Sequence, residues 1–198
     1  MALHGFHRGF TGRITARFDA VERAMLTDLV GQLTEFITPA EPDPWGANAD
    51  PLARMLGIDP AAERSDDPAL ARLFPDAYRD DEEAATEFRR YTERSLRDTK
   101  LANARTVTDS LTRSGEKLTL VDGEVQAWLG TLNDLRLTIG SRLDIRDDDD
   151  VADALSEPYD DDDPRSGLHH VYNWLTYIQE SLVQALTGIS SAPGMRGS

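Results

Sequence analysis

Carboxylates are the most abundant groups in this sequence that could do chemistry, and many of them lie in one acidic segment. The segment from Asp144 to Asp163 contains eleven acidic residues and one basic residue, Arg146. Paired carboxylates act as general acid and base only where burial or close like charges separate their pKa values. This run gives no sign of burial, and it lacks the glycine and terminal glutamate of a calcium loop. We therefore predict a solvated acidic loop over 144–165.

The histidines form two pairs that could in principle bind a metal. His4 and His7 have no carboxylate or third histidine beside them, and His169 and His170 begin the last expected helix, where we predict surface positions. A protein metal site needs three or four converging ligands, so we predict none. The motifs of serine hydrolases, phosphate-binding loops, dinucleotide-binding folds and zinc proteases are absent from the sequence. We expect no cofactor and no catalytic residue, and hence a protein that is not an enzyme.

Length and composition indicate an ordinary folded protein. The chain has 198 residues, of which 39% are hydrophobic and 29% charged. At this length about 70% of the unfolded surface can be buried, so we expect one domain over 1–188 and a disordered tail over 189–198. The absence of cysteine excludes disulfides and thiolate chemistry. No apolar run reaches the roughly 18 residues of a membrane span, and no signal peptide is evident, so we expect a cytoplasmic protein without membrane attachment.

The formal net charge of −15 at pH 7 restricts the class of partner. Unaided binding to DNA or to an anionic membrane needs a concentrated basic face that neutralises phosphates. No stretch of this sequence is basic enough to overcome the repulsion from the acidic segment. The charge therefore favours a protein partner, with DNA reached only indirectly through that partner.

The segment DGEVQAWLGTLNDLRLTIGSRL at 122–143 is the element around which the others are expected to pack. Its apolar residues recur at steps of three and four, which places them on one face of a helix capped by Asp122. These residues are Val125, Trp128, Leu132, Leu135 and Ile139. A last helix over 167–186 repeats the rhythm, and two such stripes joined by a loop should pack antiparallel.

Local signals indicate the remaining helices. Asp19 and Glu22 have the spacing of a capping box, and two Asp-Pro pairs are suited to begin short helices. A further segment is helix-forming throughout. The helices predicted from these signals cover 20–37, 51–56, 68–73 and 82–113.

The strands are fewer and shorter. Residues 4–18 resemble a short hairpin with a glycine turn, and the strand-like KLTLV at 117–121 needs a partner, for which 13–18 is the candidate. The predicted fold class is mainly α, a helical bundle with a small two-stranded β element near the N-terminus.

Polar residues beside the apolar stripes are the candidates for binding a partner. Gly130 and Gly140 lie inside a helix, where each costs about 1 kcal/mol relative to alanine. Their small-residue stripe either admits another backbone closely within the fold or receives a partner. The charges of the helix at 82–113 form either a solvated face with ion pairs or a partner-facing surface. The predicted partner-binding residues are Lys100, Asn103, Arg105, Asn133 and Arg136.

Five sequence blocks, in this order, resemble an actinobacterial family catalogued as a domain of unknown function that includes the oxidative-stress transcriptional regulator AosR. The blocks are DPLARMLGI, DDPALARLFPDAYRDD, AATEFRRYTERSLRDTKLANARTV, VQAWLGTLNDLRLTIGSRLDI and YNWLTYIQESLVQAL. The resemblance covers nearly the whole chain, and the combination of KLANAR with LNDLRL is distinctive.

The resemblance implies a non-enzymatic regulator of stress-gene transcription that binds an extracytoplasmic-function sigma factor. The family's link to a Clp-protease adaptor implies an accessory or adaptor role in the Clp system as the alternative. A cysteine pair has been proposed as a redox switch within the family, and this chain has no cysteine, so it cannot sense an oxidant in that way. The sequence is compatible with a monomer or a homodimer.

Overall fold

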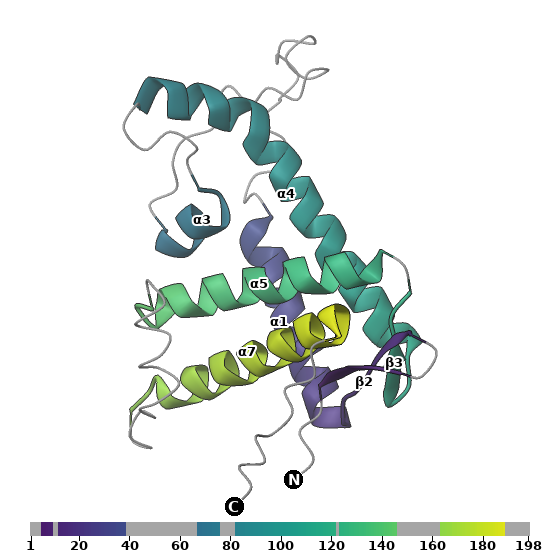
Figure 1. The fold of residues 1–198 in the computed structure, drawn as a ribbon. Coiled ribbons are helices and arrows are strands. Elements are labelled where there is room, and N and C mark those ends of the chain that lie inside the picture. The colour runs from purple at the N-terminus through teal and green to yellow at the C-terminus, as the bar shows by residue number, and fades with distance from the viewer. Residues whose placement is uncertain are drawn as a thin grey trace, which may run out of the picture.

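Five helices and a three-stranded sheet form the described part of the computed structural model, which covers residues 5–9, 12–38, 67–75, 82–121, 123–145 and 163–188 (Figure 1). The helices are α1 (Ala20–Ile37), α3 (Pro68–Leu73), α4 (Glu82–Arg113), α5 (Glu124–Arg142) and α7 (Ser166–Thr187). The strands are β1 (Phe6–Arg8), β2 (Ile14–Arg17) and β3 (Lys117–Thr119). The predicted class, mainly α, is confirmed.

Helix α5 lies at the centre of the structure and contacts α1, α3, α4 and α7. Its apolar stripe is buried, with Trp128 0% and Leu132 1% exposed. Helix α7 runs antiparallel beside α5 (Figure 1) and buries Leu175, Ile178 and Leu182. Because both stripes turn inward, their burial is a main source of hydrophobic stabilisation, and the antiparallel packing predicted from their rhythm is confirmed.

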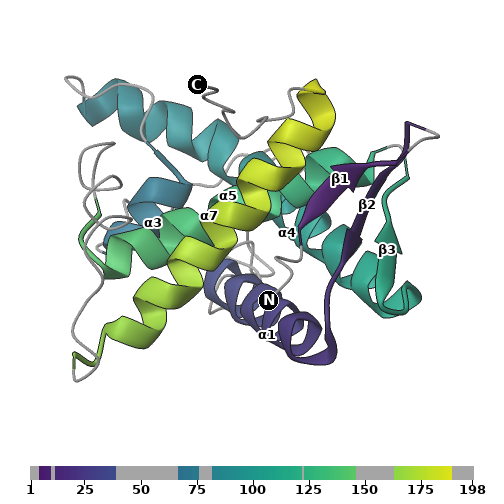
Figure 2. The ribbon, with the colours of Figure 1, turned by 60° about the horizontal axis from the view of Figure 1, so that its bottom comes forward.

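The sheet packs against one end of the helices, with β1 next to α7 and β3 on the far side (Figure 2). It has three antiparallel strands, where the sequence predicts two. The third arises because both predicted pairings form: the hairpin joins β1 to β2, and β2 also pairs with β3. Phe6 and Phe18 contact Trp128 with ring centroids 5.2 and 6.1 Å apart, so the sheet and α5 share one aromatic core.

The predicted starts of α1 and α3 are confirmed. The Asp19 carboxylate accepts the N–H groups of Val21 and Glu22, and the Glu22 carboxylate accepts the Asp19 N–H, which completes a capping box. Asp67 is the N-cap of α3, with Pro68 in the first turn. Local sequence chemistry is therefore sufficient to place both helix starts.

The start of α5 differs from its prediction. The N-cap position is Gly123, whose φ of 89° suits glycine, and not Asp122, which lies outside the described residues. The Glu124 carboxylate accepts the N–H of Val121 at 2.9 Å. A side chain that follows the cap position thus stabilises this turn.

Arg23 of α1 binds carbonyl groups at the C-terminal end of α4. Its guanidinium donates to the carbonyls of Gly115 at 2.8 Å and Ser114 at 2.7 Å, and also to that of Leu111. The last carbonyls of a helix have no partner within it and carry partial negative charge. Arg23 therefore joins α1 to α4 by satisfying groups that the helix leaves open.

We expect Arg23→Met to lower the free energy of unfolding by about 2 kcal/mol, since hydrogen bonds to charged groups contribute roughly 1.5–3 kcal/mol. Urea-induced unfolding measures the change. Arg13→Met removes an exposed arginine and the same charge, and should stay within about 0.5 kcal/mol of the unchanged protein. Equal losses in the two variants would contradict the role given to Arg23.

Three predictions fall outside the described residues: the short helix over 51–56, most of the acidic loop over 144–165, and the tail over 189–198. Where the borders of the acidic segment are described, Ile145 is buried and the Asp163 carboxylate accepts a hydrogen bond from Arg165. Among the helices that the structure describes, none is long and apolar enough to cross a membrane.

Candidate protein-binding face

The five predicted partner-binding residues lie on α4 and α5, which pack side by side (Figure 1). Lys100 and Asn103 contact α5, Arg136 contacts α7, and Arg105 and Asn133 are exposed. They do not form one continuous surface. Asn103 and Arg105 are two positions apart on the same helix, so they point to nearly opposite sides of it.

Lys100 and Asp134 form an ion pair between α4 and α5. The Lys100 Nζ and Asp134 Oδ1 atoms are 2.6 Å apart, and the side chains are 13% and 4% exposed. Phe74, which follows α3, lies with its ring centroid 6.0 Å from Lys100 Nζ and 4.4 Å from the Arg97 guanidinium. The pair and its aromatic neighbour therefore connect three helices.

Burial raises the pKa of the Asp134 carboxyl above its ordinary value of 3.8, although the hydrogen bond and the charge of Lys100 oppose this rise. With a raised pKa the folded protein takes up this proton more readily than the unfolded chain. The contribution of Asp134 to stability therefore increases as the pH falls through its raised pKa. Burial of the charged carboxylate depends on its pairing with Lys100.

The two glycines of α5 allow side chains of neighbouring helices to approach closely. A Cβ atom at Gly130 would lie 2.9 Å from Nδ2 of Asn103, and one at Gly140 would lie 3.3 Å from Cε2 of Tyr172. Of the two alternatives for the small-residue stripe, these contacts support close packing within the fold, with side chains rather than backbone as the close neighbours.

Arg136 connects α5 to α7. Its guanidinium donates to Thr176 Oγ1 at 2.9 Å and to Gln179 Oε1 at 3.0 Å, and it lies 5.4 Å from the ring centroid of Tyr172. These partners are neutral. The fold therefore fixes the position of the Arg136 side chain, while no carboxylate of the described residues pairs with its charge.

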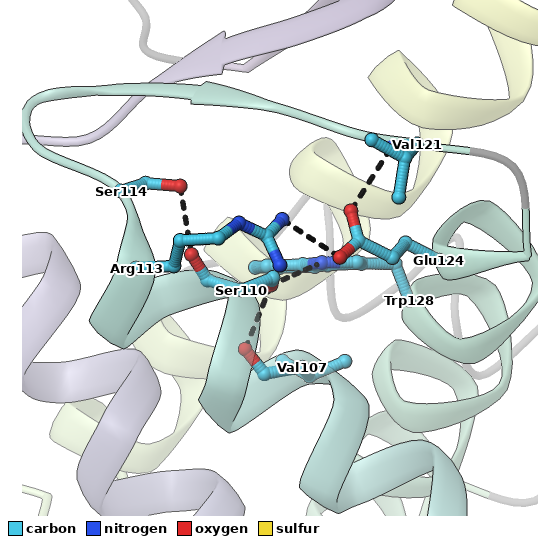
Figure 3. A network of polar contacts seen from close by, with 7 residues as sticks. All are labelled: Val107, Ser110, Arg113, Ser114, Val121, Glu124 and Trp128. Atoms are coloured by element: carbon cyan, nitrogen blue, oxygen red, sulfur yellow. Dashed lines mark hydrogen bonds and ion pairs between the residues drawn. The ribbon is translucent and has the colours of Figure 1, made fainter.

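A buried polar network closes the turn from α4 through β3 to α5 (Figure 3). The indole N–H of Trp128 donates to Ser110 Oγ at 3.0 Å, and both side chains are 0% exposed. Arg113 donates to Glu124 at 2.7 Å, and the second oxygen of Glu124 accepts the Val121 N–H. Because the buried members Ser110, Glu124 and Trp128 are all paired, the network holds the two helices in register.

His169 does not lie where the sequence predicts it. It is 1% exposed, whereas His170 is exposed as expected. The prediction was wrong because His169 shares a face of α7 with Tyr172 and Thr176, at helical spacing, and that face turns inward. In the part of the chain that the structure describes, no group of three or more acidic or histidine side chains could hold a metal ion.

Asp134 and Ser110 are polar residues of this region that were not predicted. A signal exists for Asp134, because a carboxylate directly beside the apolar stripe of a buried helix needs a cation from a neighbouring element. No comparable signal exists for Ser110, since serine is common on solvated helix faces and its partner is eighteen positions away in the sequence.

Comparisons with known proteins match most of the chain. The model of a family described as "Domain of unknown function (DUF2017)" matches residues 3–186. The chain is 29% identical over 210 residues to the "Oxidative stress regulator AosR" of Mycobacterium tuberculosis, covering 91% of this chain and 92% of that protein. It is 33% identical over 179 residues to the "Putative oxidative stress regulator AosR" of Mycobacterium leprae, covering 83% of this chain and 78% of that protein. No solved structure matches.

Proposed function

Because this chain belongs to the DUF2017 family, we propose that it is a stress-response regulator that binds an extracytoplasmic-function sigma factor and catalyses no reaction. The observation that carries the proposal is the family match over residues 3–186, together with relatives named oxidative stress regulators. Those names support the stress-response role. The sigma factor as partner is supported by the sequence blocks that resemble the family.

The ion pairs formed by the buried carboxylates support a binding role over a catalytic one. Asp134 pairs with Lys100 and Glu124 pairs with Arg113, in each case between packed helices. A general acid or base must face a bound substrate and keep a position free for proton transfer. Asp134 and Glu124 of α5 are each held by a cation of α4, so these two carboxylates serve the packing of α4 against α5.

Arg105 is the predicted contact best placed to meet a partner. It is exposed on α4, and no described residue forms an ion pair with it. On a chain with a net charge of −15, an exposed arginine that forms no ion pair with a described residue favours a carboxylate of a binding partner, which would guide association and fix orientation. With no cysteine in the chain, thiol oxidation cannot be the signal that this regulator itself receives.

We expect Arg105→Glu to weaken binding to a purified extracytoplasmic-function sigma factor about tenfold, a loss of the size found when a contact at an interface is removed. The melting temperature should not change, because Arg105 is exposed. Titration calorimetry measures the affinity, and Gln126→Glu on the exposed side of α5 controls for added negative charge. Arg136→Glu should instead lower the melting temperature, since its bonds to α7 are lost.

Two outcomes would count against these assignments. Full affinity in Arg105→Glu would remove Arg105 from the interface. Failure of the unchanged protein to bind extracytoplasmic-function sigma factors, combined with binding to a Clp chaperone or adaptor, would overturn the sigma factor proposal in favour of an adaptor role.

A further inference from the structure

The outer edge of β3 has no further strand beside it within the described chain. The order β1-β2-β3 places β3 at the edge that faces away from α7 (Figure 2). The opposite edge is covered, because the N–H of Phe6 donates to Ser181 Oγ of α7 at 2.9 Å. A free edge offers a row of backbone donors and acceptors to an added strand.

The pairing register identifies the groups that point outward. The N–H of Leu120 bonds to the carbonyl of Ile14 at 2.9 Å. In an antiparallel pair, residues that bond to the neighbouring strand alternate with residues that do not, so Leu118 also bonds toward β2. The N–H and C=O groups of Lys117 and Thr119 therefore point away from β2, toward the free edge.

Cations gather on the face of the sheet that is turned away from the helices. Successive strand residues alternate between the two faces: Ala16 and Leu118, both 0% exposed, face the helices, whereas Thr15 lies on the other face, covered by its neighbours in the sheet to 7% exposure. Arg17 and Lys117 are exposed, and they lie directly opposite each other in the register. Like charges in that arrangement repel. Arg13 precedes them on the same face, and none of the three forms an ion pair with a described residue.

The neighbouring acidic residues do not neutralise this face. The carboxylates of Asp19 and Glu22 each accept a backbone N–H in the capping box of α1, and neither forms an ion pair with Arg17 or Lys117. Glu116 alternates with Lys117 and so belongs to the other face. The repulsion between Arg17 and Lys117 is thus left for an anionic group from outside to relieve.

We infer that the free edge of β3 binds an acidic, extended segment of a protein partner as a fourth strand. The inference rests on the proposed function, since it assigns a surface to that partner. The added backbone pairs with Lys117 and Thr119, and alternate carboxylates lie over Arg17 and Lys117. A polypeptide is favoured over a nucleic acid because only a polypeptide supplies a ladder of N–H and C=O groups.

The charge requirement is tested with a short fluorescent peptide of alternating glutamate and threonine, and with the same peptide carrying lysine in place of glutamate. Anisotropy should show binding of the glutamate peptide only. The double variant Arg17→Glu and Lys117→Glu should weaken that binding about tenfold or more, whereas Gln126→Glu, on the exposed side of α5, should leave it unchanged. Binding of the lysine peptide, or equal effects of all these substitutions, would overturn the inference.

The backbone requirement is tested by Thr119→Pro, with Thr119→Ala as its matched control. Proline removes an N–H that points away from β2, so the ladder between β2 and β3 is kept and both variants should fold, as circular dichroism can verify. Peptide binding should be lost in the proline variant only. In the unchanged protein the peptide should protect the amides of Lys117 and Thr119 from hydrogen exchange. Binding without this protection would mean a purely electrostatic contact and would overturn strand addition.

The result for the sigma factor separates this inference from the proposed function. If the sigma factor binds and Thr119→Pro does not affect its affinity, the inference is wrong while the function stands. If the glutamate peptide binds as described but the sigma factor does not, the surface is real and the partner has been misassigned. Tighter binding of a DNA duplex than of the peptide at this face would overturn the choice of an acidic polypeptide.

Discussion

Lys100→Met is expected to lower the free energy of unfolding by about 3–5 kcal/mol at neutral pH, the range found when one partner of a buried ion pair is removed. The substitution keeps most of the side-chain volume but leaves the Asp134 carboxylate, 4% exposed, without its cation. Urea denaturation at pH 7 measures the loss. Arg105→Met removes an exposed cation from the same helix and should change stability by less than about 0.5 kcal/mol.

The pH dependence of this loss distinguishes lost charge pairing from lost packing. Burial already raises the pKa of Asp134, and removal of Lys100 removes the influence that opposed the rise. As the pH falls through the raised pKa, the buried carboxylate takes up a proton, so the difference between the variant and the unchanged protein should shrink. The double variant Lys100→Met and Asp134→Asn should regain much of the stability at pH 7. A difference that stays constant as the pH is lowered from 7 would show that packing alone was lost.

Trp128→Ala is expected to lower the free energy of unfolding by about 3–5 kcal/mol, as is usual for large aromatic residues in cores. Trp128 is 0% exposed and packs against two phenylalanine rings that belong to the sheet region. A loss of this size is a large part of the total stability of a typical domain, about 5–15 kcal/mol. Guanidinium denaturation measures it, and Trp174→Ala, at a half-buried tryptophan of α7, should cost clearly less. Equal costs would contradict a central position for Trp128.

A double-mutant cycle separates the hydrogen bond of Trp128 from its packing. Ser110→Ala leaves the buried indole N–H without an acceptor, which should cost about 1–3 kcal/mol. Trp128→Phe removes the donor and keeps part of the ring. The double variant lacks both partners and should be more stable than the sum of the two single losses predicts. Additive losses would mean that the bond contributes no coupling between α4 and α5.

The elements of this fold could be predicted because their signals are local. The helices over 20–37 and 82–113 have the predicted bounds, and the capping chemistry at Asp19 and Asp67 marks the starts of α1 and α3. The apolar rhythm at 122–143 and 167–186 was sufficient to identify the buried faces of α5 and α7. The surface prediction for His169 was wrong because histidine is often exposed, whereas the helical spacing from His169 to Tyr172 and Thr176 places it on the buried face of α7.

The contacts between elements could not be predicted, because they depend on how the helices pack. Lys100 meets Asp134 across thirty-four positions of sequence, and Arg23 reaches carbonyls about ninety positions away. For the same reason, the sequence alone does not show which candidate residues contact a neighbouring helix and which are accessible to a partner. Arg105 and Arg136 have the same chemistry in the sequence, but only Arg136 lies where α7 supplies acceptors. The cations of the sheet face are spread over distant segments, and only the strand register brings them together.

The contact between β1 and α7 has a consequence for how the protein is made. The N–H of Phe6 donates to Ser181 Oγ, and a Cβ atom on Gly5 would lie 2.8 Å from that same oxygen. During translation the first strand leaves the ribosome long before the helix on which it rests, so the outer edge of β1 stays uncovered until α7 has emerged. A chain truncated before α7 would leave this edge of β1 and the side of α5 that packs against α7 without their cover.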